Sequence, residues 1–267
     1  MSRIDETFAR LRSDGRTGLV TFVTAGDPDR ERSALVLETL DRAGADVLEV
    51  GIPFSDPLAD GPAIQRSSER ALAAGATLAS SLDLIGRVRP RIEAPVVVFS
   101  YANPVLAMGL DRFVRRAADV GVDGVLVLDL PIEEADELRD AAAGVAIDPI
   151  FLLSPTTTDA RIRRAATLGR GFLYGISRLG VTGERDTIAT GARELVERIR
   201  AITALPVALG FGISRPEHVA QVGAWADAAV VGSGLVNTVA RASQGGDLAG
   251  EVDRYVRWLK GGSSTNR

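Results

Sequence analysis

The chain has no cysteine, one histidine and one lysine among its 267 residues. Without cysteine it cannot form disulfides or bind a metal through thiolates. Lys260 lies close to the polar C-terminal segment, which disfavours Schiff-base chemistry, since that chemistry needs a desolvated lysine in a pocket. A catalytic zinc site normally takes two or three histidines, and we expect His218 to be an exposed helix residue. We therefore expect no metal site, and Asp, Glu and Tyr remain for proton transfer.

The chain also has no excess of positive charge and no long apolar run. The formal net charge is -4, so no basic field attracts nucleic acid, and no polybasic cluster suggests a membrane surface. No apolar run reaches the roughly eighteen residues that span a bilayer, and the N-terminus lacks a signal-peptide core. These features predict a cytoplasmic protein that acts on a small molecule.

Short apolar, β-branched runs alternate with amphipathic stretches along the chain. The runs are near-continuous, which is typical of parallel strands covered by helices. The expected strands are Gly18 to Ala25, Val47 to Ile52, Pro95 to Tyr101, Gly124 to Leu130, Pro149 to Ser154, Phe172 to Ser177, Pro206 to Gly212 and Ala228 to Ser233. This α/β alternation predicts a single (β/α)8 TIM barrel.

The expected barrel has additions to the basic repeat. Ile4, Phe8 and Leu11 have helical spacing and predict an extra N-terminal helix that closes one end of the core. The loop after the second strand has room for an extra helix, at 63–73, before the one at 78–88. One domain over residues 1–260 and a flexible polar tail at 261–267 are expected. The runner-up, a doubly wound open sheet, is weakened because no G-x-G-x-x-G follows the first strand.

The most informative stretch is DVLEVGIPFSDPLADGPAIQ, which begins at Asp46. Glu49 lies within a buried strand, on the face opposite the branched residues Leu48 and Val50. Asp60 follows on a proline-rich loop. A buried carboxylate has a raised pKa, which suits a general acid or base, although a buried acid can also pair with an arginine for structural reasons.

Small residues at the ends of the last two strands predict a phosphate site. Gly212 follows the seventh strand, and Gly232, Ser233 and Gly234 follow the eighth. Such turns expose backbone N-H groups and a helix N-terminus to an anion, as in many barrels of this kind. The glycine-rich loop at 177–191, which includes Thr182 and Gly183, suits a lid over this site or a surface loop without a role.

Aromatic residues occupy three strands near the same end of the barrel. Tyr174 is a core aromatic or, if it points inward, a residue whose hydroxyl needs a partner. Phe22 and Phe99 are core residues by default and could also flank an aromatic ligand.

The motifs together resemble the tryptophan synthase alpha chain family. The resemblance rests on LEVGIPFSDPLADGPAIQ and continues through TFVTAGDPD, SYANPV, VLDLPIEE, FLLSPTTTDARI, SRLGVTG, GFGIS and GSGLV, in family order along nearly the whole chain. It implies lyase activity in tryptophan biosynthesis: retro-aldol cleavage of indole-3-glycerol phosphate to indole and glyceraldehyde 3-phosphate. No metal or cofactor is implied for this chain.

The resemblance also implies roles for individual residues. The catalytic set matches Glu49, Asp60 and Tyr174. The substrate-binding set matches Phe22, Ile64, Phe99, Gly183, Gly212, Gly232, Ser233 and Gly234. The implied partner is a beta chain that carries pyridoxal phosphate, in an alpha-beta-beta-alpha heterotetramer. We expect Asp56, Pro57, Arg178 and Thr182 to relay the ligand state to that partner.

Two other functions remain open at this point. Another phosphosugar barrel, such as an isomerase, would share the carboxylates and the phosphate turns but would lack an aromatic-sized pocket. A non-catalytic subunit would keep the barrel only to activate a partner. In the lyase interpretation, neutral Glu49 protonates indole C3, and Asp60, expected to be ionised on a more solvated loop, stabilises the charge on the ring nitrogen.

Overall fold

The computed structural model describes residues 1–176, 191–210 and 212–261. Its strands pair in parallel, in the order β5-β4-β3-β2-β1-β9-β8-β7-β6. The terminal strands of this order, β5 and β6, are separated in the chain only by Ile150, so the sheet closes into a barrel. The strands are β1 (Gly18–Thr24), β2 (Val47–Gly51), β3 (Val96–Ser100), β4 (Gly124–Val127), β5 (Asp148–Pro149), β6 (Phe151–Leu153), β7 (Leu173–Ile176), β8 (Val207–Gly210) and β9 (Ala228–Val231).

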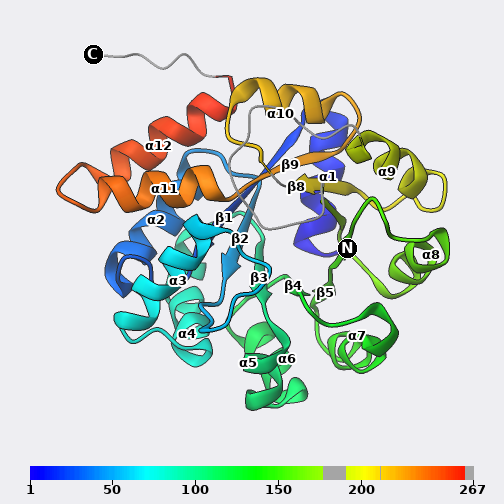
Figure 1. Ribbon diagram of the computed structural model, residues 1–267, viewed down its shortest axis with the longest axis horizontal. Helices are drawn as coiled ribbons and strands as arrows, with labels where there is room; N and C mark the ends of the chain where they lie inside the picture. The colour runs from blue at the N-terminus through cyan, green and yellow to red at the C-terminus, as the bar shows by residue number, and fades with distance from the viewer. Residues whose placement is uncertain (177–190, 211, 262–267) are drawn as a thin grey trace.

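Helices surround these strands (Figure 1). They are α1 (Arg3–Ser13), α2 (Arg30–Arg42), α3 (Pro62–Ala73), α4 (Leu78–Val88), α5 (Ala102–Met108), α6 (Leu110–Asp119), α7 (Asp136–Ala143), α8 (Asp159–Leu168), α9 (Gly191–Arg200), α10 (Pro216–Gly223), α11 (Ser233–Ala242) and α12 (Leu248–Leu259), with 3-10 turns η1 (Arg89–Arg91) and η2 (Ile132–Glu134). Two helices lie between β2 and β3, and α1 precedes β1. The predicted TIM barrel with an added N-terminal helix and added loop helices is confirmed.

The fifth predicted strand is divided into two strands in the structure. The sequence predicts one strand at Pro149 to Ser154, whereas the structure has two short strands on either side of Ile150. The chain changes partner at this point: β5 pairs with β4, and β6 pairs with β7. Ile150 still donates its N-H to the carbonyl oxygen of Val125, at 2.9 Å, so the barrel wall is continuous there.

Helix α1 packs its apolar face against the inside of the barrel. Ile4, Phe8 and Leu11 are buried and belong to one cluster with inward-facing strand residues. The rings of Phe8 and Phe172 lie 5.5 Å apart between centroids. Ser2 caps the helix by accepting a hydrogen bond from the N-H of Asp5. The helix therefore closes the end of the barrel opposite the carboxyl ends of the strands, as the periodicity predicted.

Aspartates join neighbouring strands at that closed end. Asp46, Asp123 and Asp227 each precede a strand and accept a hydrogen bond from the backbone N-H of an adjacent strand. The donors are Leu19 at 2.9 Å, Val96 at 2.8 Å and Val207 at 2.8 Å, respectively. Each bond satisfies an N-H at a strand start, where the ladder supplies no partner. These aspartates contribute to the barrel rather than to the chemistry at its other end.

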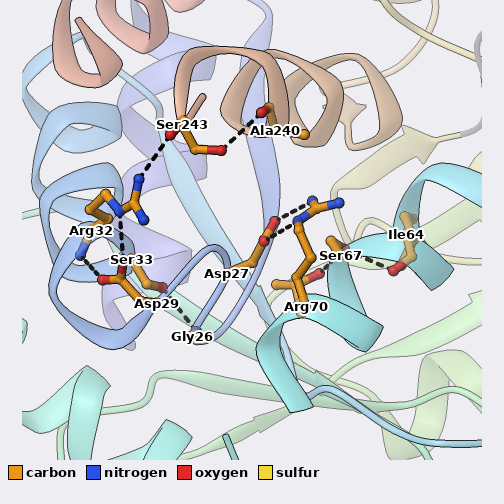
Figure 2. A network of polar contacts seen from close by, with 11 residues as sticks. Gly26, Asp27, Asp29, Arg32, Ser33, Ile64, Ser67, Arg70, Ala240 and Ser243 are labelled. Atoms are coloured by element: carbon orange, nitrogen blue, oxygen red, sulfur yellow. Dashed lines mark hydrogen bonds and ion pairs between the residues drawn. The ribbon is translucent and has the colours of Figure 1, made fainter. Parts of the chain in front are cut away.

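Helix α3 is tied to the end of β1 by side chains on its inner face (Figure 2). Arg70 donates two hydrogen bonds to the buried carboxylate of Asp27, at 2.7 and 2.8 Å. Ser67 and Thr24 share a hydrogen bond of 2.6 Å between their hydroxyl oxygens. Because α3 starts two residues after Asp60, these contacts also fix the end of the acidic loop.

Within the described residues, no single helix combines the length and apolar character needed to cross a membrane. One pair, Pro62–Ala73 with Leu78–Arg91, satisfies those two criteria jointly but is bent by 92° at the break. The predicted division into a domain at 1–260 and a tail at 261–267 stays a prediction, and residues 262–267 lie outside the described part of the chain.

Candidate active site

Glu49 faces the interior of the barrel. Strand β2 alternates as predicted, since Val47 packs in the interior cluster while Leu48 and Val50 pack between the sheet and the helices. In the parallel register Glu49 lies between Phe22 of β1 and Val97 of β3. Its side chain therefore projects into the barrel near the carboxyl end of the strands, where the active sites of such barrels lie.

Among the described residues, no cation pairs with the carboxyl group of Glu49. The residue is 1% exposed, and its Oε1 atom has no hydrogen-bond partner among the described residues. Burial raises the pKa of Glu49 from 4.5 to about 8, with no cation opposing the shift. No arginine among the described residues pairs with Glu49, as the structural alternative would require. At neutral pH Glu49 is mostly protonated and can donate a proton.

Asp60 is buried, which corrects the expectation of a solvated loop carboxylate. It is 6% exposed, because the chain folds back on itself on both sides of it. The N-H of Asp60 donates to the carbonyl oxygen of Pro57 at 3.0 Å, and the Gln65 side-chain amide donates to the carbonyl oxygen of Asp60 at 2.7 Å. Burial raises the pKa of Asp60 to about 6, and the Tyr101 hydroxyl opposes this shift. Asp60 is thus still mostly ionised at pH 7, although it is not solvated.

Tyr101 is a site residue that the sequence analysis missed. It follows β3, and its hydroxyl accepts a hydrogen bond from the N-H of Ala59 at 3.1 Å. Its ring packs on Phe54, with 5.2 Å between centroids. Burial, followed by the charge of Asp60, raises the pKa of Tyr101 and keeps the phenol protonated. In the sequence, Tyr101 could have been identified by its position at a strand end, where other polar site residues are expected.

Tyr174 points into the barrel from β7. It is buried within the interior cluster, and its hydroxyl lies over Gly210, where a Cβ atom would come within 2.5 Å of that oxygen. Burial first, and the charge of Glu49 second, raise the pKa of Tyr174. The phenol is therefore a neutral hydrogen-bond donor close enough to Glu49 to be affected by its charge.

An apolar cluster lies beside the two acids. Phe22 and Phe99 meet edge to face, with 5.6 Å between ring centroids, and Ile64 packs with them. The ring of Phe22 covers Gly51, where a Cβ atom would lie 2.5 Å from it. Val236 of α11 completes this cluster and was not anticipated. These side chains form an apolar wall that suits an aromatic ring.

Small residues follow β8 and β9, and Gly232 lies beside this wall. Gly212 has φ of 81°, a backbone conformation that favours glycine. Gly232 is the N-cap of α11, which starts at Ser233 and Gly234. A Cβ atom at Gly232 would lie 3.6 Å from Cβ of Phe22. The positive end of α11 is therefore next to the apolar wall.

The remaining predicted site residues lie in two loops. Asp56 and Pro57 are on the acidic loop, where Asp56 is exposed and Ser55 donates to its carboxylate at 2.6 Å. Arg178, Thr182 and Gly183 lie outside the described residues.

His218 is buried at 5% exposure, so the prediction of an exposed histidine is wrong. Its Nδ1 atom accepts a hydrogen bond from the N-H of Ser214 at 3.4 Å, which draws the first turn of α10 against the loop after β8. Among the described residues, no group of three or more His, Asp or Glu side chains is placed to hold a metal ion.

Fold and site together define a class. The parallel (β/α)8 barrel, with two buried acids of raised pKa and an apolar wall at the carboxyl end of its strands, is typical of TIM-barrel enzymes.

Comparisons with known proteins identify the family. The family model for the tryptophan synthase alpha chain matches residues 8–256. The tryptophan synthase alpha chain of Geobacter sulfurreducens is 49% identical over 260 residues, which cover 97% of this chain and 98% of that one. That of Gloeobacter violaceus is 46% identical over 264 residues, covering 98% and 95%.

Solved structures agree with this match. Tryptophan synthase subunit alpha from Legionella pneumophila superposes with a TM-score of 0.88 at 35% identity and covers 98% of each chain. A Mycobacterium tuberculosis tryptophan synthase structure gives 0.90 at 33% identity, covering 99% of each chain. The chain belongs to the tryptophan synthase alpha chain family. It is thus a lyase that cleaves indole-3-glycerol phosphate in tryptophan biosynthesis, which excludes the phosphosugar isomerase alternative.

Proposed function

We propose that Glu49 is both the acid and the base of the cleavage. Its carboxyl group gives a proton to C3 of the indole ring, which becomes an indolenine. The resulting carboxylate takes the proton of the hydroxyl group on the adjacent glycerol carbon. The electron pair that the broken O-H bond leaves on oxygen forms the C=O bond of the aldehyde, the carbon-carbon bond breaks, and its electron pair returns to the ring. Indole and glyceraldehyde 3-phosphate are released, and Glu49 ends as it began, protonated.

The single observation that carries this proposal is that Glu49 is buried, faces inward and has a raised pKa. It is a buried inward-facing acid with an Oε1 atom that has no partner among the described residues, and burial raises its pKa to about 8. A group with a pKa near the working pH can both give and accept a proton in one catalytic cycle.

Asp60 has the complementary role in this proposal. Protonation at C3 places positive charge on the ring nitrogen, and an ionised carboxylate that accepts the N-H hydrogen bond stabilises that charge. The lower pKa of Asp60, about 6, supports this division, because at pH 7 it is mostly ionised while Glu49 is mostly protonated. The Tyr101 hydroxyl supports the ionised form of Asp60.

The other predicted residues bind the substrate. Phe22, Ile64 and Phe99 hold the indole ring against their apolar wall, and Tyr174 donates its hydroxyl to the polar part of the substrate beside Glu49. The phosphate binds at Gly212, Gly232, Ser233 and Gly234, with Gly183 from the loop outside the described residues. Phosphate binding at the N-terminus of α11 is supported by the helix dipole.

A beta chain is the partner of alpha chains in tryptophan synthase. We propose an alpha-beta-beta-alpha heterotetramer in which the beta chain holds pyridoxal phosphate and consumes the indole. Asp56 and Pro57, with Arg178 and Thr182, relay the ligand state to it. The exposed position of Asp56, next to Leu58, which is 88% exposed, supports a partner surface on this loop.

The proposed chemistry requires no cofactor in this chain, since Glu49 supplies and recovers the proton and Asp60 supplies the countercharge. A cytoplasmic location is also part of the proposal, because the phosphorylated substrate is charged and is retained inside the cell.

The test is Glu49→Gln. The amide keeps the size of the side chain but can neither give nor take the proton, so turnover of indole-3-glycerol phosphate should fall by about 10³-fold or more. The dissociation constant for indole should stay within about two-fold. Residual turnover within ten-fold of the wild type would contradict the acid role.

Asp60→Asn tests the second acid separately. The neutral amide keeps a hydrogen-bond acceptor but loses the countercharge, so kcat should fall by about 10²-fold or more. A rate close to wild type would show that this carboxylate does not face the ring nitrogen.

A further inference from the structure

Two side chains outside the proposed substrate pocket hold the backbone of Ser214. This residue follows Gly212 in the turn after β8, and it is buried. Its N-H donates to Nδ1 of His218 at 3.4 Å. Its carbonyl oxygen accepts from the hydroxyl of Tyr255 at 3.0 Å. Both backbone polar groups of Ser214 are therefore bonded to side chains of the helices behind it, α10 and α12.

The Tyr255 hydroxyl also contacts the turn after β9. A Cβ atom added at Gly234 would lie 2.2 Å from the hydroxyl oxygen of Tyr255 and 3.4 Å from Cβ of Ser214. The glycine at 234 leaves the space that the hydroxyl group occupies. One oxygen atom from the C-terminal helix thus lies between the two turns, bonded to one and packed on the other.

This arrangement matters because backbone N-H groups bind a phosphate only where the backbone already points them at it. The two turns belong to different strand-helix units, so their relative position is not set by either unit alone. A side chain that contacts both removes this freedom before the ligand arrives, which lowers the entropy that binding must overcome.

We propose that Tyr255 is a positioning residue for phosphate binding: its hydroxyl group fixes the turn at Gly212 and Ser214 relative to the turn at Gly234. The inference rests on the proposed phosphate site. Tyr255 does not touch the substrate, and its effect passes through Ser214. Loss of the hydroxyl group leaves the buried carbonyl oxygen of Ser214 without this donor, and the turn can shift to find another.

The experiment compares phosphate-bearing and phosphate-free ligands in the full chain. For Tyr255→Phe, one lost hydrogen bond corresponds to about a five-fold change in affinity. The dissociation constant for inorganic phosphate and KM for indole-3-glycerol phosphate should each rise about five-fold. The value of kcat and the dissociation constant for indole should stay within about two-fold. If Tyr255 had a merely structural role, Tyr255→Phe would change the melting temperature, and the affinities for phosphate-bearing and phosphate-free ligands would change to the same extent.

Three variants serve as comparisons. Trp258→Phe alters the ring that packs 5.8 Å from Tyr255 on the same helix and should leave the phosphate affinity unchanged. Gly234→Ala places a methyl group where the hydroxyl lies and should reproduce the effect of Tyr255→Phe. Gly212→Ala strains the turn itself at its positive φ and should weaken phosphate binding at least as much.

The outcomes distinguish the positioning role of Tyr255 from the phosphate site on which that role depends. If Gly212→Ala weakens phosphate binding and Tyr255→Phe does not, the positioning role is wrong and the phosphate site stands. If neither variant changes the affinity for inorganic phosphate, the phosphate site itself is wrong and the inference fails with it. A rise confined to Tyr255→Phe, Gly234→Ala and Gly212→Ala supports both.

Discussion

Glu49 and Asp60 are two carboxylic acids in one barrel mouth that ionise differently. Burial raises both pKa values, to about 8 for Glu49 and about 6 for Asp60. The difference follows from their neighbours. No group described near Glu49 stabilises its charge, whereas the Tyr101 hydroxyl beside Asp60 favours the ionised form. One proton donor and one countercharge therefore coexist near neutral pH.

These values predict a bell-shaped dependence of kcat on pH. Turnover should fall as pH rises above about 8, because Glu49 loses its proton, and as pH falls below about 6, because Asp60 gains one. Steady-state rates of indole release across this range check it. In Asp60→Asn the residual activity should lose the decline on the acid side. A wild-type profile that stays flat well above pH 9 would show that protonated Glu49 is not required.

The same pKa shift predicts that Glu49 reduces stability at high pH. Between the unfolded value of 4.5 and the folded value of about 8, the folded chain binds more protons than the unfolded chain, so the free energy of unfolding falls as pH rises. Glu49→Gln should therefore be more stable than wild type by a few kcal/mol at pH 9, an order-of-magnitude figure, and close to it at pH 4.

Urea unfolding at several pH values measures this difference. Glu137→Gln, at an exposed position, is the control and should track the wild type throughout. A constant gap between Glu49→Gln and wild type at all pH values would show that the carboxyl group ionises normally in the folded protein.

From the sequence, the inward-facing acid Glu49 could be predicted, but the burial of Asp60 and His218 could not. Strand alternation, a local property of the sequence, predicts that the side chain of Glu49 faces the interior of the barrel. Asp60 and His218 are held by contacts of irregular turns, the turn that begins at Pro57 and the turn after β8. The Tyr101 hydroxyl, which favours the ionised form of Asp60, comes from a distant part of the sequence. Local periodicity reports neither kind of contact.

Helix α3 is the element that connects the fold to the chemistry. It starts directly after Asp60 and Gly61, carries Ile64, and is anchored through Arg70 to Asp27 and through Ser67 to Thr24. Asp27 is buried, and desolvation raises its pKa while Arg70 opposes this. The ion pair therefore holds a helix whose first turn carries part of the site.

We predict that Arg70→Gln lowers the free energy of unfolding by about 1–3 kcal/mol, because it leaves the Asp27 carboxylate buried without its partner. The figure allows for the partial exposure of Arg70, 33% of its side chain. The double variant with Asp27→Asn should recover much of the loss. Urea unfolding gives both values.

Arg116→Gln is the matched control, since it removes an arginine from a more exposed ion pair with Asp83. It should cost less than about 1 kcal/mol. Equal losses for Arg70→Gln and Arg116→Gln would mean that the Asp27 pair does not anchor α3.

The elements themselves could be predicted well because each is marked locally. Apolar runs locate the strands, and α4 has the bounds that its periodicity predicted. The break at Ile150 could not be foreseen, since it arises where the chain changes its pairing from β4 to β7. Strand pairing is decided by the whole barrel, not by the run of residues.

At the scale of the molecule, the barrel separates stability from function. The end closed by α1 is apolar and is joined by aspartates at the strand starts. The open end carries the acids, the apolar wall and the small-residue turns. This polarity was predictable from the position of Asp60 and Gly232 after their strands, because all carboxyl ends of parallel strands meet at one end of a barrel.

The central claim is that Glu49 moves a proton to and from C3 of the indole ring. The direct measurement is exchange of the C3 hydrogen of indole in D2O, followed by proton NMR with glyceraldehyde 3-phosphate present. Because the reverse reaction passes through the same protonated ring, the wild-type chain should exchange this hydrogen, and Glu49→Gln should exchange it no faster than buffer while still binding indole. Exchange by Glu49→Gln at the wild-type rate would contradict the account.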